Sequence, residues 1–289
     1  MARSGVEAMS GVLEIVSLSA QSSNGRVLRD VSLSVGRGEV MALVGESGAG
    51  KTTIAKAILD ILPPAIRITS GRILFGGADL LALDEASRRK LLGVRIALIP
   101  QDPLTSLNPS RRIGGQLTDG LRLRGGLDRK AAMARAAQLL TDVHIIDPQQ
   151  VLQRYPHELS GGMRQRVLIA QAFSLNPELI IADEPTTALD VTVQKQVLRL
   201  IRQLQREHQT TLIFVTHDLG VVAQICDDIT VLYGGKVVEQ GRTADVLMAP
   251  KHPYTQALLA ANPRYDRPEQ SLRPVPEPVI AALREELAR

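Results

Sequence analysis

The chain has 289 residues, enough to bury a sizeable core, and its 44% apolar and 22% charged content is typical of a globular protein rather than a disordered or fibrous one. Lys and Arg number 34 against 30 Asp and Glu, so the net charge is only +4 and is weak evidence for nucleic-acid binding. The single cysteine, Cys226, excludes an internal disulfide and a cysteine-rich zinc or iron–sulfur centre.

The apolar pattern predicts neither membrane crossing nor secretion. No apolar run approaches the ~20 residues needed to span a bilayer, and residues 1–10 lack the pattern of a secretory signal. We therefore expect synthesis to end in the cytoplasm. Aromatic residues are scarce, with 4 Tyr, 3 Phe and no Trp, which removes the stacking platforms that proteins binding single-stranded nucleic acid need.

The N-terminal part predicts strands followed by a glycine-rich loop and a helix. Short β-rich runs occupy residues 12–18, 31–35 and 40–44, with turn signals at Asn24-Gly25 and at 36–38. Apolar residues then recur at helical spacing from Thr52 to Leu62, and Pro63-Pro64 closes the helix. The predicted order for residues 40–62 is strand, glycine loop, helix.

The rest of the chain alternates helices with strands. The expected elements are a hairpin-like segment at 72–77, a strand at 95–100, helices over 113–153, a helix at 161–173, and buried strands at 179–182 and 212–216 around a helix at 193–208. This alternation predicts an α/β core with a parallel sheet.

Beyond Gly241 the pattern weakens, and frequent prolines predict an extended tail that wraps the surface. We divide the chain into an N-terminal tail at residues 1–11, a main domain at 12–245 with a helical insertion at about 104–158, and a C-terminal extension at 246–289.

The glycine-rich loop fits the pattern G-x-x-x-x-G-K-[ST] in full, between a buried strand and a helix N-terminus. The expected nucleotide-binding residues are Gly45, Glu46, Ser47, Gly48, Ala49, Gly50, Lys51 and Thr52, with the adjacent Thr53. Glycines let backbone N–H groups converge on an anion, Lys51 neutralises the β- and γ-phosphates, and the Thr52 hydroxyl can ligate Mg²⁺. An ordinary glycine-rich turn is the alternative, and strand, loop, Lys and Thr together argue against it.

A pair of carboxylates ends the first of the two buried strands. Asp183 lies at the C-terminal edge of the sheet, where α/β proteins place their ligands, and would hold Mg²⁺ through water beside the phosphate loop. Glu184, one residue on, points elsewhere and can polarise the attacking water. In isolation such a pair could be two solvated acids, but the phosphate loop favours the catalytic interpretation.

A histidine follows the second buried strand at the same edge. His217 could hydrogen-bond the γ-phosphate, with a charge state tunable near neutral pH, although alone it would more often be a structural loop histidine. The remaining histidines share no metal-ligand spacing and are expected to be structural: His144, His157, His208 and His252.

Ser160-Gly161-Gly162 opens the helix expected at 161–173. Ser160 is placed as the N-cap, and the bare glycines leave the first turn open, so this is a second helix end suited to an anion. A second cradle makes sense if it closes over the nucleotide of another subunit, but a well-capped helix is the simpler interpretation of these residues alone.

In chain order, the phosphate loop, Gln101 after a strand, Leu159-Ser160-Gly161-Gly162, Asp183-Glu184, residues 188–190 and His217 resemble the motifs of ABC-transporter ATPase subunits. The resemblance covers residues 12 to about 245. The Leu-Ser-Gly-Gly element separates this family from other phosphate-loop proteins. The implied fold is an α/β P-loop NTPase (RecA-like) core with an antiparallel β subdomain, an inserted α-helical subdomain and a proline-rich C-terminal extension.

The same resemblance implies how the site is assembled. Two subunits would sandwich two ATP molecules, each between the phosphate loop of one chain and the Ser160 helix of the other. Gln101 would sense Mg²⁺ and the attacking water. The implied catalytic set is Glu184, His217 and Gln101, and the implied metal set is Thr52, Gln101 and Asp183. The helical insertion would dock on membrane subunits.

Residues 101–109 and 251–259 are similar to the branch of importers for oligopeptides, dipeptides and nickel. This implies a peripheral ATPase subunit at the cytoplasmic face of a bacterial inner membrane. Its partners would be a second, non-identical ATPase subunit, two integral permeases and a periplasmic solute-binding protein. Peptides are favoured as cargo because this ATPase type serves them most widely, with nickel or another small solute as the alternative.

Other classes of function explain less of the sequence. A soluble ABC ATPase acting on DNA or ribosomes is supported only by the small positive charge, so no nucleic-acid partner is expected. A phosphate-loop kinase would leave Ser160-Gly161-Gly162 and the tail unexplained. The chain departs from many relatives in having no aromatic residue before Phe75 to stack on adenine, and from some branch members in lacking the cysteines of an iron–sulfur cluster.

Overall fold

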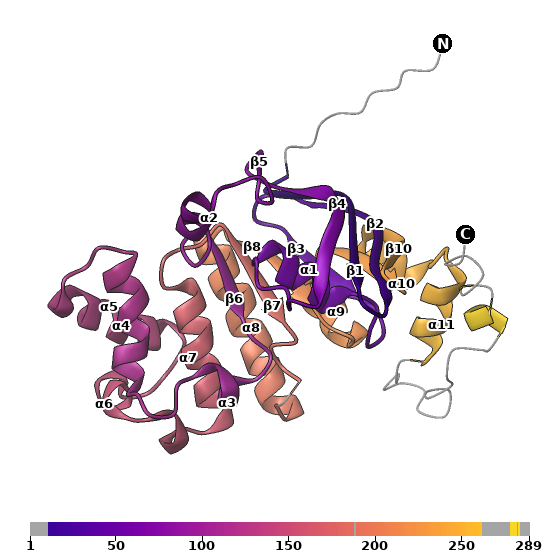
Figure 1. Ribbon diagram of the computed structural model, residues 1–289. Helices are drawn as coiled ribbons and strands as arrows, with labels where there is room; N and C mark the ends of the chain where they lie inside the picture. Colours follow the sequence, from indigo (N-terminus) through magenta and orange to yellow (C-terminus); the bar gives the residue numbers. More distant parts are fainter. Residues whose placement is uncertain (1–10, 188, 262–277, 282, 284–289) are drawn as a thin grey trace, which may run out of the picture.

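The computed structural model describes residues 11–187, 189–261, 278–281 and 283, and packs two β-sheets and a group of helices against one another (Figure 1). The 4-stranded sheet has the order β2-β1-β4-β5, and the 6-stranded sheet has the order β10-β9-β3-β8-β7-β6. In the larger sheet all neighbouring strands are parallel except β9 and β10. The predicted α/β core with a parallel sheet is therefore confirmed.

The smaller sheet is antiparallel and consists of β1 (Leu13–Ser22), β2 (Gly25–Val35), β4 (Ile66–Phe75) and β5 (Ala78–Asp79). The hairpin of β1 and β2 turns at Ser23-Asn24, one residue before the predicted Asn24-Gly25, and Gly25 pairs with Ser22 as the first residue of β2. Strands β1 and β2 are longer than the apolar runs at 12–18 and 31–35 from which they were predicted. Polar residues that interrupt the pattern of β1 are accommodated where its register shifts, as at Ser17, which has φ 52°.

The larger sheet consists of β3 (Val40–Val44), β6 (Ile96–Ile99), β7 (Leu179–Asp183), β8 (Thr211–Val215), β9 (Asp228–Tyr233) and β10 (Lys236–Arg242). Alternate side chains of β3 enter two different cores: Val40, Ala42 and Val44 pack on one face and Met41 and Leu43 on the other. Burial on both faces explains why the central strands appear in the sequence as unbroken apolar runs.

Helix α1 (Lys51–Ile58) packs in the core that joins the two sheets, through Ile54, Ala55, Ala57 and Ile58. In Figure 1 it lies between the antiparallel sheet and the larger sheet. The helix ends at Ile58, short of the predicted Leu62, because the chain turns ahead of the two prolines.

The remaining helices up to residue 225 are α2 (Glu85–Leu91), α3 (Pro103–Ser106), α4 (Ile113–Leu123), α5 (Arg129–Asp142), α6 (Pro148–Gln153), α7 (Gly161–Phe173), α8 (Val191–His208) and α9 (Leu219–Ile225), with a 3-10 turn at Pro156–Glu158. The helical stretch expected over 113–153 is thus three helices, and α7 begins and ends at the predicted residues. Helix α2 was not predicted, because none of its residues is buried and it shows no apolar periodicity.

The prediction of an extended tail is wrong for residues 243–261. They form α10 (Thr243–Met248) and α11 (Pro253–Ala261), and Tyr254 and Thr255 are buried. Pro250 falls between the helices and Pro253 opens α11, a position where a missing N–H is tolerated. Most of the later prolines lie in residues 262–277, outside the described residues. Within the described part of the chain no helix is both long enough and apolar enough to cross a membrane.

Candidate functional site

The predicted site elements follow neighbouring strands at one edge of the larger sheet. β3, β8, β7 and β6 are adjacent and parallel, with Asp183 paired to Val215 and Val215 paired to Leu43. Parallel strands bring their carboxyl ends to the same edge, which is where ligands bind in α/β proteins. The register therefore places the loops after all four strands at a common level.

The phosphate loop turns sharply out of β3. Gly45 has φ 153°, and a Cβ there would lie 2.3 Å from the Leu232 carbonyl oxygen, so no side chain fits. Gly50 caps α1 in a left-handed conformation with φ 102°. Between them, a Cβ at Gly48 would meet nothing within 4 Å. The loop is thus packed closely at its ends and open at its middle.

Lys51 is buried inside the loop that precedes it and is only 6% exposed. Its Nζ donates to the carbonyl oxygens of Gly45 at 2.7 Å and Glu46 at 2.9 Å. Burial lowers the pKa of Lys51 from its ordinary value, while the carboxylates of Glu184 and Asp183 act in the opposite direction. The ammonium therefore bonds to the loop backbone, and the negative charges of the two carboxylates act on its pKa.

Asp183 ends β7, and its carboxyl group is largely shielded from water. Burial raises its pKa and the adjacent Glu184 raises it further, against the lowering effects of Lys56 and Lys51. Its Oδ1 is buried and has no hydrogen-bond donor among the described residues. A buried carboxylate oxygen without a donor is costly unless a cation or water meets it, so Asp183 fits a Mg²⁺ site.

Two further predicted metal ligands carry uncharged oxygens. Thr52 follows Lys51 at the start of α1 and is exposed at the loop, and Gln101 is exposed just after β6. With Asp183 they offer hydroxyl, amide and carboxylate oxygens, which suit Mg²⁺. Among the described residues no cluster of three or more His, Cys, Asp or Glu could hold a metal ion. These few protein ligands suit Mg²⁺ whose other oxygens come from phosphates and water.

Glu184 is held by three side chains. His217 Nδ1 lies 3.2 Å from Glu184 Oε1, and the Gln101 amide and the Thr187 hydroxyl donate to Oε2 at 3.3 and 3.0 Å. The Glu184 backbone has φ 45°, uncommon for glutamate, and its N–H donates to the Val215 carbonyl oxygen at 2.9 Å. Residues far apart in the sequence thus fix one carboxylate at the sheet edge.

Ser160 caps α7 as predicted, because its hydroxyl oxygen accepts the N–H of Met163 at 3.3 Å. Ser160 and Gly161 are exposed, and a Cβ at Gly161 would meet nothing within 4 Å. Ser160 bonds within its own helix, because its hydroxyl accepts the Met163 N–H and its carbonyl oxygen accepts the Arg164 N–H. The strand order gathers Asp183, Glu184, Gln101 and His217 at the edge of the sheet where the phosphate loop lies, and the Ser160 helix end is not part of that set of contacts among the described residues.

Comparison with known families decides what this arrangement belongs to. A family model described as "ABC transporter" matches residues 28–187, more than half of the chain. The chain belongs to the ABC transporter family. A second model, described as "Oligopeptide/dipeptide transporter, C-terminal region", matches residues 238–286. As an ABC ATP-binding subunit the chain binds and hydrolyses ATP, and the resemblance inferred from its motifs is confirmed.

Individual relatives agree. The "Probable D,D-dipeptide transport ATP-binding protein DdpD" of Escherichia coli is 49% identical over 262 residues, which cover 90% of this chain and 80% of that protein. The "Oligopeptide transport ATP-binding protein OppD" of Bacillus subtilis is 45% identical, over 87% of this chain and 71% of that protein.

Solved structures share the ABC fold. The cbiO1 protein of Clostridium perfringens, part of the ABC transporter complex cbiONQ, has a TM-score of 0.72 at 28% identity, covering 83% of this chain and 92% of that one. The ATP-binding cassette MJ0796, solved as a dimer in a post-hydrolysis state with ADP and Pi, has a TM-score of 0.70 at 26% identity, covering 80% and 98%.

Two contacts in this ABC subunit were not predicted from sequence. Thr187 donates to Glu184, and no feature of the motif beyond a hydroxyl three residues later pointed to it. The Tyr254 hydroxyl oxygen accepts the Glu46 N–H of the phosphate loop at 3.2 Å. Tyr254 lies in the stretch 251–259 that resembles the peptide importers, but nothing in the sequence links that stretch to the loop.

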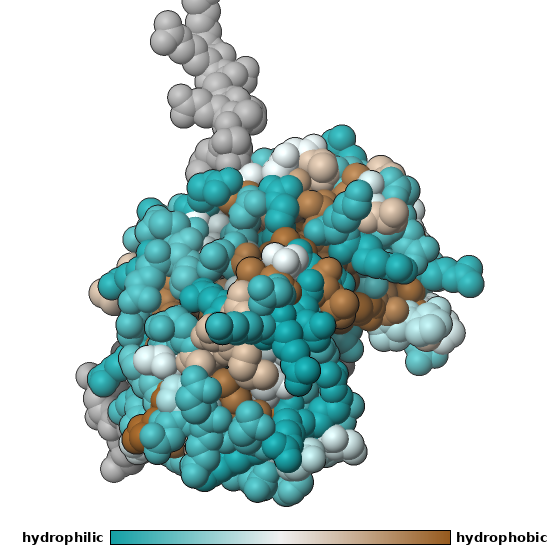
Figure 2. Space-filling model, turned by 90° about the vertical axis from the view of Figure 1, so that its left-hand side faces the viewer, coloured by the Kyte–Doolittle hydropathy of each residue, from teal (hydrophilic) through white to brown (hydrophobic). Residues whose placement is uncertain are grey.

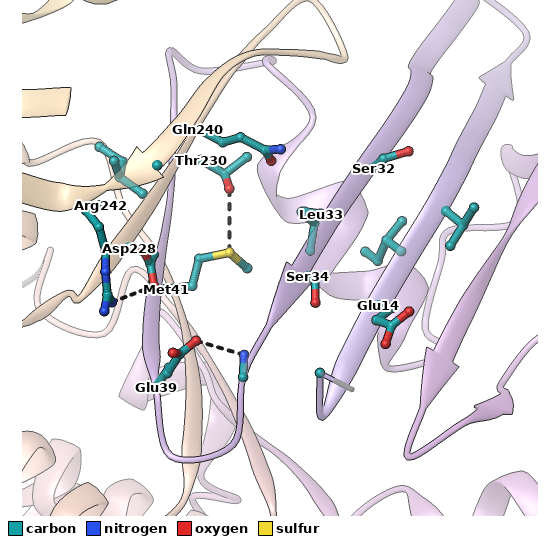
Figure 3. A pocket seen from close by; sticks show the side chains of 16 residues that line it. Glu14, Ser32, Leu33, Ser34, Glu39, Met41, Asp228, Thr230, Gln240 and Arg242 are labelled. Atoms are coloured by element: carbon teal, nitrogen blue, oxygen red, sulfur yellow. Dashed lines mark hydrogen bonds and ion pairs between the residues drawn. The ribbon is translucent and has the colours of Figure 1, made fainter. Parts of the chain in front are cut away.

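A hollow of about 1010 Å³ lies elsewhere in the ABC domain, between β1, β2, β9 and β10. Figure 3 shows Glu39, Asp228 and Arg242 around it, with Arg242 paired to Asp228 at 3.2 Å and Glu39 accepting the Gly36 N–H at 2.9 Å. Glu39 and Asp228 stand at the amino ends of their strands, opposite the phosphate loop. The described lining contains none of the predicted site residues.

Proposed function

We propose that this chain is the ATP-hydrolysing subunit of a bacterial importer for di- and oligopeptides. The observation that carries the proposal is the phosphate loop with Lys51 buried in it, at the same edge of the sheet where Asp183 and Glu184 follow β7. Peptides are the proposed cargo because relatives at 44–49% identity are named as dipeptide or oligopeptide transport proteins. The match of residues 238–286 to a region named for such transporters supports the same cargo.

The phosphate loop is the proposed binding site for the ATP phosphates. Lys51 satisfies loop carbonyl oxygens in the structure, and its ammonium turns to the β- and γ-phosphate oxygens when nucleotide binds, because charge-assisted hydrogen bonds are stronger than neutral ones. The backbone N–H groups of residues 47–53 and the positive end of the α1 dipole add further attraction for the anion.

Thr52, Gln101 and Asp183 are the proposed ligands of Mg²⁺. The ion supplies positive charge beside the phosphate oxygens. The Asp183 oxygen that lacks a donor supports this assignment, since a water molecule bound to the cation would donate to it.

Glu184 is the proposed general base. It accepts a proton from the attacking water as the water oxygen bonds to the γ-phosphorus and the bond from that phosphorus to the ADP oxygen breaks. His217, Gln101 and Thr187 hold the carboxylate for this step, and His217 is the proposed hydrogen-bond partner of the γ-phosphate.

The Ser160 helix end is proposed to complete the site of a second ATPase subunit, which we expect to be non-identical. The exposure of Ser160 and Gly161 and the open space above Gly161 support this, because they leave the helix end accessible to an anion from outside the chain. The dimeric form of the solved cassette MJ0796 is consistent with this role.

Two permeases and a periplasmic solute-binding protein would complete the importer, with this chain on the cytoplasmic face of the inner membrane. The helical insertion is the part of the chain that we assign to docking on the permeases, and a groove of about 440 Å³ lies beside it, lined in part by Ser106, Gly120 and Arg124. Figure 2 shows that the face on the side of the helices is a mixture of hydrophilic and hydrophobic surface. In this organisation residues 12–245 are the ATPase domain, about 104–158 the docking insertion, 246–289 the extension and 1–11 a tail.

Growth of a deletion strain tests the cargo. The strain is grown on di- and oligopeptides as the sole source of a required amino acid, and its urease or hydrogenase activity is measured at limiting nickel. We expect failure on peptides, restored by the wild-type chain but not by Glu184→Gln. Normal peptide use with an enzyme defect that nickel corrects would overturn the peptide assignment, and an absence of both phenotypes would indicate another small solute.

A further inference from the structure

Tyr254 connects the C-terminal extension to the phosphate loop across 208 residues of sequence. Its side chain is fully buried, and its ring packs on Tyr233 with 4.7 Å between ring centroids. Its hydroxyl oxygen accepts the N–H of Glu46 at 3.2 Å. Glu46 is the second residue of the loop, so the extension touches the loop where it leaves β3.

The position of Tyr254 is fixed by its own neighbourhood. The Glu239 carboxylate on β10 accepts the N–H groups of Lys251 at 2.8 Å and His252 at 3.0 Å, which holds the turn before α11. His252 Nδ1 then accepts the N–H of Tyr254 at 3.1 Å, and Pro253 occupies the first turn of the helix. Residues 252–254 therefore fix the start of α11 and, with it, the position of the Tyr254 hydroxyl at the Glu46 N–H.

The same side of the molecule supports the loop at other points. The Ala49 carbonyl oxygen accepts the N–H of Gly235 at 3.0 Å, and Gly45 packs against the Leu232 carbonyl oxygen. Leu232 and Gly235 belong to the hairpin of β9 and β10, against which α11 packs. The hairpin and α11 thus support the loop at Gly45, Glu46 and Ala49 from one side.

The peptide between Gly45 and Glu46 is held at both ends. Lys51 Nζ donates to its carbonyl oxygen, and Tyr254 accepts from its N–H. When the ammonium turns to phosphate oxygens it releases the carbonyl oxygen, and Tyr254 remains as an anchor of this peptide.

We propose that Tyr254 is a positioning residue for ATP binding, whose hydroxyl holds the Gly45–Glu46 peptide so that the loop N–H groups converge on the phosphates. The proposal rests on the assignment of residues 45–53 as the phosphate site. Without the hydroxyl the free loop samples more conformations, and the fraction that is competent to bind falls, so the apparent affinity falls by the same factor.

The test is Tyr254→Phe, which keeps the ring and its packing and removes only the hydroxyl. We expect the Kd for ATP with Mg²⁺, measured on the full chain, and the KM of the assembled transporter to rise about two- to tenfold, the usual worth of one neutral hydrogen bond. The kcat should stay close to wild type because Glu184 is untouched. The Tm without nucleotide should fall by only a few degrees, because one neutral hydrogen bond is lost while the ring still fills its site.

Tyr233→Phe is the matched control, because it removes a hydroxyl from the other ring of the pair without touching Glu46, and it should leave the Kd unchanged. Tyr254→Leu should lower both the Tm and the affinity, and the phenylalanine variant should recover most of the loss in Tm but not the affinity. An unchanged Kd in Tyr254→Phe, or equal losses in Tyr254→Phe and Tyr233→Phe, would overturn the proposal. Lys51→Ala in the same assay separates failure of the Tyr254 proposal from failure of the phosphate-site assignment. If Lys51→Ala too keeps normal affinity for ATP, the phosphate site itself is misassigned.

Discussion

Two helix N-termini in this chain suit an anion, and they differ in what surrounds them. The start of α1 has a glycine loop and a buried Lys51, and Asp183 and Glu184 lie at the end of β7, two strands from β3 at the same edge of the sheet. The start of α7 has a Ser160 cap and open space above Gly161.

This difference shows which features of an ATP site a helix end supplies by itself and which need residues from elsewhere in the fold. Exposed backbone N–H groups and a helix dipole arise in any well-formed helix end. Charge neutralisation, metal ligation and a general base require side chains from other strands, and among the described residues the α1 end lies at the sheet edge that supplies them. In our proposal the α1 end is therefore the main part of the ATP site, and the α7 end contributes to the site of a second subunit.

The largest expected effect at the α1 end comes from a variant that loses ATP hydrolysis but still binds ATP. Glu184→Gln should lower ATP hydrolysis by about a hundredfold or more, the usual contribution of a general base, while Lys51 and Asp183 still bind ATP with Mg²⁺. Hydrolysis and ATP binding are measured together, and an ATP-bound dimer should accumulate. Glu207→Gln, at an exposed carboxylate on α8, is the control. Turnover within a few-fold of wild type would show that Glu184 is not the base.

The next largest effect is expected when the positive charge of Lys51, which distinguishes the α1 end, is removed. Lys51→Ala should weaken ATP binding by about tenfold to a hundredfold, because a charge-assisted bond to phosphate is lost. Equilibrium binding to the purified chain measures it, with Lys130→Ala on the exposed face of α5 as the control. Normal affinity in Lys51→Ala would remove the basis of the comparison.

The smallest effect concerns the α7 end. Gly161→Asp places a carboxylate in open space at a helix N-terminus, where it favours the helix but repels a phosphate. We expect hydrolysis by the assembled transporter to fall about tenfold, while the Tm and the ATP affinity of the isolated chain hold. Gly161→Asn has nearly the same shape without the charge and should lose much less. Equal activity of the two variants would show that no phosphate approaches this helix.

The sequence specified the local parts of this protein well. The phosphate loop and the capped start of α7 rest on contacts between residues a few positions apart, so their patterns are visible in a short window. The strands β3, β7 and β8 were predicted because burial on both faces demands unbroken apolar runs. Helix α2 begins with a local cap, because the Asp84 carboxylate accepts the Ser87 N–H at 2.9 Å. No apolar stripe accompanies this cap, so the sequence pattern does not distinguish α2 from a loop.

The tertiary structure alone decided which residues meet. Gln101 and Glu184 are 83 residues apart, and Glu184 and His217 are 33 apart, and strand order in the parallel sheet makes them neighbours. Residues 243–261 form helices although their prolines predict an extended tail. Burial of Tyr254 and Thr255 against the β9–β10 hairpin stabilises the helical conformation. The Tyr254 contact to Glu46 had no sequence signal, because a single hydrogen bond between distant segments leaves no periodicity and exists only once both segments pack on the same hairpin.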